Sequence, residues 1–175
     1  MKSAVIISGS LAQDHEFIYP FYRLLEEKIR LDVCLIGGKP VNGILGTPLP
    51  PNKNHAVKDI DHISVKDYDL LVLPGGVKAM EKIRQDKRLI SFISNFHKED
   101  KLIACICSGA QLLISAKIVK GKKIAGYYSM EDDLTNAGAI YTDKEVVSDS
   151  KIITTAHYKD MGPWMGETIR QLNNA

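Results

Sequence analysis

The chain has 175 residues, of which 45% are hydrophobic and 25% are charged, a composition typical of soluble globular proteins. Its 23 basic and 21 acidic residues give a net charge of +2, and scattered lysines give no case for a nucleic-acid partner. No apolar run approaches the roughly 18 residues that a membrane-spanning helix needs, and the first ten residues hold an apolar core too short for a secretory signal. We expect one domain over residues 1–175.

The three cysteines are Cys34, Cys105 and Cys107. An odd number with this spacing fits neither a zinc site nor a disulfide framework. Reduced thiols are typical of cytoplasmic proteins, so we expect a cytoplasmic location. The sequence predicts no metal site and no cofactor.

In the first part of the chain, residues 3–8 are expected to form a strand. The segment 16–29 follows with a helical pattern, in which Pro20 is tolerable only near the first turn. The predicted apolar stripe of this helix is Phe17, Phe21, Leu24 and Leu25. Residues 31–38 predict a second strand that ends in a glycine turn. Residues 39–66 are rich in Pro, Asn, Gly and His, which indicates loops and a small β-excursion.

The second part of the chain continues the alternation of strands and helices. Residues 68–76 and 102–106 predict buried strands, and residues 145–156 predict two strands joined at Asp149-Ser150. Helices are expected around Leu89–Phe96, over 108–118, over a short segment stopped by Gly138, and over 162–172, where Trp164 anchors the helix to the core or to a partner subunit. This alternation predicts a mainly parallel sheet covered by helices on both faces.

Cys107 lies where the strand 102–106 passes into a helix, and Gly109 two positions later allows the helix and the strand to approach closely. The pattern matches the G-x-S-x-G elbow with cysteine in place of serine. A helix N-terminus favours the thiolate, so we expect a lowered cysteine pKa. Free amides at Ser108 and at Gly75-Gly76 are expected to bind an oxyanion. The alternative, a small buried hydrophobic cysteine, remains open here and is favoured for Cys34 and Cys105.

The segments "YDLLVLPGG" and "KLIACICSGAQLLISAKIVKGKKIAGYYSMEDDLTNAGA" resemble the ThiJ/PfpI superfamily, which includes parkinsonism-associated deglycase-type proteins and archaeal PfpI peptidases. The resemblance covers essentially the whole chain. It implies a flavodoxin-like three-layer α/β sandwich and a homodimer or larger homo-oligomer. It also implies that Cys107 is the nucleophile, that Glu16 reaches its sulfur as a protonated carboxyl, and that amides of Gly76 and Ser108 face the site.

The chain departs from the family at the positions of the usual basic partners. Ser108 stands where PfpI-type peptidases have a histidine, Tyr127 where deglycase-type members have one, and Ala156 where the family has an arginine. His157, His15 and Tyr127 are the remaining candidates for acid–base roles, although each also fits a structural or surface role. A cysteine nucleophile needs less activation than a hydroxyl, but an amide leaving group needs a proton donor. Peptide hydrolysis is therefore disfavoured.

Three functions remain open at this point. The first is a glyoxalase- or deglycase-like enzyme in which Cys107 adds to a small electrophilic carbonyl and Glu16 transfers the proton. The second is a PfpI-like cysteine peptidase or amidase with His157 or His15 as base. The third is a non-catalytic redox sensor or holdase chaperone, in which Cys107 oxidises to a sulfinate. A role of the reactive cysteine in stress protection is an option beside the carbonyl chemistry of the first function. A flavodoxin-like cofactor protein is the weakest alternative, because "SGSLAQ" is a poor phosphate cradle.

Overall fold

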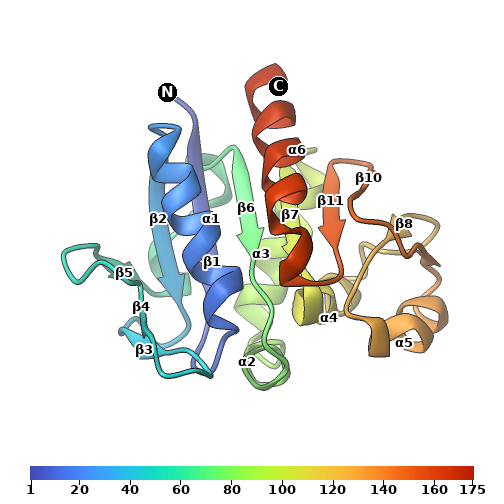
Figure 1. Cartoon of the computed structure of the whole chain (residues 1–175), viewed down its shortest axis with the longest axis horizontal. Coiled ribbons are helices and arrows are strands. Elements are labelled where there is room, and N and C mark those ends of the chain that lie inside the picture. Colours follow the sequence, from blue (N-terminus) through green and yellow to red (C-terminus); the bar gives the residue numbers. More distant parts are fainter.

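A computed structural model describes residues 1–175, and Figure 1 shows the arrangement of its elements. The strands are β1 Ser3–Ser8, β2 Arg30–Leu35, β3 Val41–Asn42, β4 Pro48–Leu49, β5 Val57–Lys58, β6 Leu70–Leu73, β7 Leu102–Ile106, β8 Lys123–Ile124, β9 Ile140–Tyr141, β10 Val147–Asp149 and β11 Ile152–Thr155. The α-helices are α1 Asp14–Glu26, α2 Val77–Ile83, α3 Lys87–Lys98, α4 Ala110–Ser115, α5 Glu131–Asn136 and α6 Met161–Asn174. The longest helix, α6, has 14 residues, and no helix here combines the length and the hydrophobicity that a bilayer-spanning segment needs.

Seven strands form one sheet in the order β10-β11-β7-β6-β1-β2-β5. All neighbouring pairs are parallel except β10 and β11. Helices α1 and α6 cover one face of the sheet, and α2, α3 and α4 cover the other (Figure 1). The predicted flavodoxin-like sandwich is therefore confirmed. The expected small β-excursion is also present, because β3 and β4 pair separately from the sheet.

Helix α1 begins two residues earlier than the sequence predicted. The Gln13 side chain caps it by accepting the N–H of His15, so Pro20 lies in the second turn instead of the first. Proline there removes one N–H from the helical ladder, a cost that the burial of Phe17 and Phe21 against the sheet offsets. The prediction that Leu25 belongs to the buried stripe is wrong. Leu25 is 37% exposed because it lies beside the stripe that Phe17, Phe21 and Leu24 form.

The helix after Cys107 is shorter than predicted. Residues Cys107–Gly109 form a 3-10 turn, and α4 ends at Ser115 because Lys117 adopts a left-handed backbone with φ of 59°. The closing helix α6 agrees with the prediction for its tryptophan. Trp164 is fully buried, and its indole N–H donates to the Ile153 carbonyl oxygen at 3.2 Å, which ties α6 to β11.

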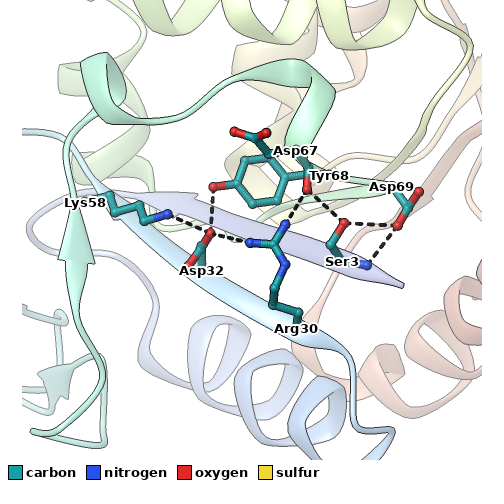
Figure 2. A network of polar contacts seen from close by, with 7 residues as sticks. All are labelled: Ser3, Arg30, Asp32, Lys58, Asp67, Tyr68 and Asp69. Atoms are coloured by element: carbon teal, nitrogen blue, oxygen red, sulfur yellow. Dashed lines mark hydrogen bonds and ion pairs between the residues drawn. The ribbon is translucent and has the colours of Figure 1, made fainter. Parts of the chain in front are cut away.

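Polar contacts connect the amino ends of the central strands (Figure 2). The Asp32 carboxylate of β2 accepts hydrogen bonds from Lys58 of β5 at 2.9 Å and from the Tyr68 hydroxyl at 2.8 Å. The backbone N–H of Ser3 donates to the Asp69 carboxylate at 2.8 Å, which links the start of β1 to the start of β6. Ligands of parallel α/β sheets bind at the opposite, carboxyl ends of the strands. This network therefore stabilises the sheet at the end away from the candidate site.

Candidate active site

Cys107 occupies a strained bend at the carboxyl end of β7. Its φ is 59°, a left-handed backbone that non-glycine residues adopt rarely and at a cost of about 1–3 kcal/mol. The residue before it is extended and the residues after it enter the 3-10 turn, so the chain reverses from strand to helix at this cysteine. Its side chain is 8% exposed and lines a cavity. The backbone therefore has the elbow conformation that the Cys-Ser-Gly sequence indicates.

Glu16 reaches this elbow from the first turn of α1 and is only 1% exposed. One carboxyl oxygen, Oε2, accepts the backbone N–H of Gly75 at 2.8 Å. The Cys107 side chain lies beside this carboxyl, because both border the Gly75 Cα. The other oxygen, Oε1, is buried without a hydrogen-bond partner, so it is free to hold a proton. The fold thus brings α1, the turn after β6 and the turn after β7 together around one carboxyl and one thiol.

Burial dominates the titration of this pair. It raises the pKa of Glu16 to about 7, against the lowering effects of the Cys107 side chain and of the Gly75 N–H. Burial, followed by the negative charge of Glu16, raises the pKa of Cys107 to about 12. The sequence-based expectation of a lowered cysteine pKa is therefore wrong. The helix amides that favour a thiolate are outweighed by the loss of solvent and by the adjacent carboxylate.

The pair therefore shares a single proton above neutral pH. With Glu16 ionised, the sulfur keeps its proton, and a thiolate forms when that proton moves to the carboxyl. The pKa of Glu16 is higher in the folded state than in the unfolded state, so the folded state binds this proton more tightly. The resulting contribution to the free energy of unfolding is complete at low pH and is lost as the pH rises through about 7. Raising this pKa from 4.5 to about 7 makes the folded state about 3 kcal/mol less stable at alkaline pH than an unshifted carboxyl would.

Only some of the predicted amides are available to a substrate. The Gly75 N–H is already bonded to Glu16, which contradicts its expected role as an oxyanion donor. The Gly76 N–H has no partner in the protein, and Gly76 borders the cavity with φ of 101°, a conformation suited to glycine. Ser108 places its amide against the Cys107 sulfur and its hydroxyl oxygen 3.7 Å from it. Gly76 is thus a free backbone donor at the cavity.

The cavity at Cys107 has a volume of about 520 Å³, which suits a small organic ligand. Its walls come from the residue that caps α1, the β3–β4 loop, α2, the turn after β7, α4, the segment before α5 and α5 itself. The lining residues are Gln13, Ile44, Gly76, Val77, Glu81, Cys107, Ser108, Gln111, Tyr127, Ser129, Met130 and Asp133. Glu81 and Asp133 are the charged members of this set. The fold groups no three His, Cys, Asp or Glu side chains in a way that suits a metal ion.

The two histidines considered as bases lie outside the cavity lining. His15 stacks on Tyr158 with ring centroids 5.3 Å apart. His157 packs on the same tyrosine at 4.0 Å, and its Nδ1 accepts the Lys159 N–H at 3.2 Å. Tyr127 does line the cavity, and its backbone N–H donates to the Cys107 carbonyl oxygen at 3.2 Å. Of the three acid–base candidates, the structure brings only Tyr127 to the cavity that Cys107 lines.

Sequence reasoning missed several side chains that line the cavity, among them Gln13, Glu81, Gln111 and Asp133. The position of Gln111 could have been predicted from the sequence, because it lies four residues after Cys107 and helical residues at this spacing share a face. Those of Gln13, Glu81 and Asp133 could not, since these residues lie far from Cys107 in sequence. Their positions depend on how the carboxyl ends of β1, β6 and β7 meet.

Comparisons with known proteins agree with this geometry. The model of the DJ-1/PfpI family matches residues 2–171. A Pyrococcus furiosus protein named deglycase PfpI is 32% identical over 168 residues, which cover 96% of this chain and 98% of the relative. Protein/nucleic acid deglycase 2 of Escherichia coli is 33% identical over 175 residues, 98% of this chain and 97% of the relative.

A solved structure supports the same assignment. A two-domain protein of Anabaena variabilis, with DJ-1/ThiJ/PfpI-like and ferritin-like domains, superposes with a TM-score of 0.91 at 26% identity. The match covers 99% of this chain and 48% of that protein, so the likeness concerns about half of its length. Several related chains carry enzyme names, which supports a hydrolase or lyase type of family. The chain belongs to the DJ-1/PfpI family.

Proposed function

We propose that this protein is a glyoxalase- or deglycase-like enzyme that acts on small electrophilic carbonyl compounds through Cys107. The observation that carries the proposal is the buried pair of Glu16 and Cys107 at a cavity of about 520 Å³. A carboxyl with a pKa of about 7 both accepts and returns a proton at neutral pH, which addition to a carbonyl requires. The names of the deglycase relatives agree with this chemistry.

The first step forms a covalent adduct. Glu16 takes the thiol proton, and the Cys107 sulfur adds to the aldehyde carbon of a 2-oxoaldehyde such as methylglyoxal. The carbon–sulfur bond forms while the carbonyl π electrons move to oxygen, which then takes the proton back from Glu16. The free Gly76 N–H donates to that oxygen as its charge develops. The product is a hemithioacetal.

The second stage transfers hydrogen within the substrate. The Glu16 carboxylate removes the C–H proton of the former aldehyde carbon, which gives an enediolate, and the hydroxyl proton on that carbon passes to the oxygen of the neighbouring carbon. Glu16 then returns its proton to the neighbouring carbon, and the former aldehyde carbon becomes a thioester carbonyl. The resulting thioester is cleaved by water, which releases a 2-hydroxy acid and the thiol. The aldehyde carbon is oxidised and the keto carbon is reduced, so the sequence needs no external oxidant or reductant.

The peptidase alternative has less support. An amide leaving group must be protonated, and neither His15 nor His157 lines the cavity that holds Cys107. The redox alternative keeps a physical basis in the buried cysteine beside Glu16, but it makes no use of the surrounding cavity. The carbonyl proposal accounts for the thiol, the carboxyl, the free amide and the cavity together.

Purified protein given methylglyoxal is expected to form lactate, and Cys107→Ala is expected to form it at less than a hundredth of that rate. Cys34→Ala is the matched control, because it removes a second buried thiol outside the cavity. Chromatography of lactate against time measures both. Equal rates for Cys107→Ala and the unmodified protein would exclude the proposed function.

The proposal extends to three further properties. We place the enzyme in the cytoplasm, a compartment in which its three free cysteines stay reduced. We treat residues 1–175 as one domain built on the seven-stranded sheet. We also propose a homodimer or larger homo-oligomer, which size-exclusion chromatography with light scattering tests: a monomer mass at micromolar concentration would refute it.

A further inference from the structure

Gln111 borders the same cavity as the Cys107 sulfur. It is the second residue of α4 and follows Cys107 by four positions, so it lies about one helical turn beyond the elbow. It also borders a second hollow of about 300 Å³, which shares Glu81, Met130 and Asp133 with the first. Gln111 therefore belongs to the walls of both hollows.

Arg84 holds the Gln111 side chain from the second hollow. Arg84 follows the last residue of α2 and borders the second hollow but not the first. Its Nε donates to the Ser115 hydroxyl oxygen at 2.9 Å, and its Nη1 donates to Gln111 Oε1 at 3.3 Å. Both partners are neutral, and both lie on the helical segment that follows Cys107. The guanidinium thus links α2 to α4.

This contact fixes which way the Gln111 amide is turned. A guanidinium only donates hydrogen bonds, so the oxygen of the amide and not its nitrogen must face Arg84. The amide nitrogen Nε2 then lies on the other side of the amide group, where it has no hydrogen-bond partner in the protein. Since Arg84 is confined to the second hollow, the two free N–H donors are available to the cavity at Cys107.

The cavity needs such a donor. The N–H of Gly75, one of the amides expected to bind an oxyanion, already donates to Glu16, whereas the N–H of Gly76 has no partner in the protein. We infer that Gln111 is a catalytic residue whose Nε2 donates to the substrate carbonyl oxygen, and that Arg84 is a positioning residue that fixes the amide for this purpose. The inference rests on the proposed function, because it names a further group for the same carbonyl addition.

Two substitutions of Gln111 separate donation from packing. Gln111→Glu keeps the size of the side chain and the acceptor oxygen for Arg84 but loses the N–H donors. Gln111→Ala loses the acceptor and the donors. Each is expected to lower kcat for methylglyoxal by about 10- to 100-fold with little change in KM, because the donor binds the developing alkoxide better than the ground-state carbonyl. Gln85→Ala is the matched control: Gln85 is exposed and lies outside both hollows.

Substitutions of Arg84 test the positioning role. Arg84→Met releases the amide and is expected to lower kcat about 3- to 10-fold, a smaller effect than losing the donor itself. Arg84→Lys supplies a donor at the same place and is expected to recover part of that loss, whereas a purely structural role predicts no such recovery in kcat at equal thermal stability. Thermal unfolding midpoints measured alongside kcat distinguish the two.

A second measurement does not depend on turnover. Methylglyoxal that adds to Cys107 protects it from iodoacetamide, and this protection is expected to develop about 10-fold more slowly in Gln111→Ala, because the missing donor stabilises the developing alkoxide. Wild-type kinetics and protection in both Gln111 variants, with Cys107→Ala inactive, would overturn the inference and leave the proposed function intact. Full activity in Cys107→Ala, or no protection and no turnover in the unmodified protein, would overturn both.

Discussion

Glu16→Gln is expected to lower kcat for methylglyoxal by about 10²- to 10⁴-fold, the usual range for loss of a positioned acid–base group. The carboxyl lies beside the Cys107 side chain and its pKa is about 7, so it can both take the thiol proton and return it. Glutamine keeps the shape and still accepts the Gly75 N–H, but it cannot accept a proton. Steady-state kinetics at pH 7.5 measure the effect.

Glu26→Gln is the matched control for this prediction. Glu26 lies on the same helix with its side chain 71% exposed, and its one ion pair, with Arg23, is 3.8 Å long. Exposed pairs of this kind contribute little to stability, so the control is expected to retain kcat within a factor of two. A Glu16→Gln enzyme within threefold of the unmodified protein would show that proton transfer by this carboxyl is dispensable.

Gly75→Ala is expected to damage both folding and activity. A Cβ at this position would overlap the Glu16 Oε2 oxygen, lie 2.8 Å from the Cys107 Cβ and lie 3.0 Å from the Ile106 carbonyl oxygen. Overpacking of this kind costs about 1–3 kcal/mol, and here it also separates the two reacting groups. We expect a loss of about 3 kcal/mol in the free energy of unfolding, with kcat reduced by at least about 100-fold.

Gly166→Ala provides the comparison. Gly166 lies in α6, and a Cβ added there would meet no atom within 4 Å. Alanine in a helix interior is favoured over glycine by about 0.5–1 kcal/mol, so this variant is expected to be slightly more stable. Urea unfolding measures both variants. Gly75→Ala with unchanged stability and kcat would contradict the tight packing of the Gly75 turn against Glu16 and Cys107.

The fold was largely predictable because the buried strands are long apolar runs. Residues 102–106 and the two strands within 145–156 appear where expected, since β-rich segments alternate with helical patterns and with turn residues. The start of α1 was less predictable. It depends on the Gln13 side chain as a cap, and glutamine is not among the residues that usually signal a helix start.

The position of the site was predictable, whereas its electrostatics were not. Cys107 precedes Ser108 and Gly109 at a strand end, a local pattern that the sequence displays directly. The raised pKa of Cys107 arises from burial and from Glu16, which is 91 positions away in the chain (107 − 16). The bond from Gly75 to Glu16 has the same origin, because it exists only once α1 packs against the turn after β6.

The central claim is that Glu16 and Cys107 share one proton. The most direct test is the rate at which iodoacetamide labels Cys107 from pH 5 to 10, in the unmodified protein and in Glu16→Gln. In the unmodified protein the rate is expected to rise through about pH 7, because only the one-proton state of the pair allows the thiol proton to move to the carboxyl and leave a reactive thiolate. In Glu16→Gln burial still raises the thiol pKa, so the rise is expected only at clearly alkaline pH. Identical pH profiles for the two proteins would contradict the shared proton.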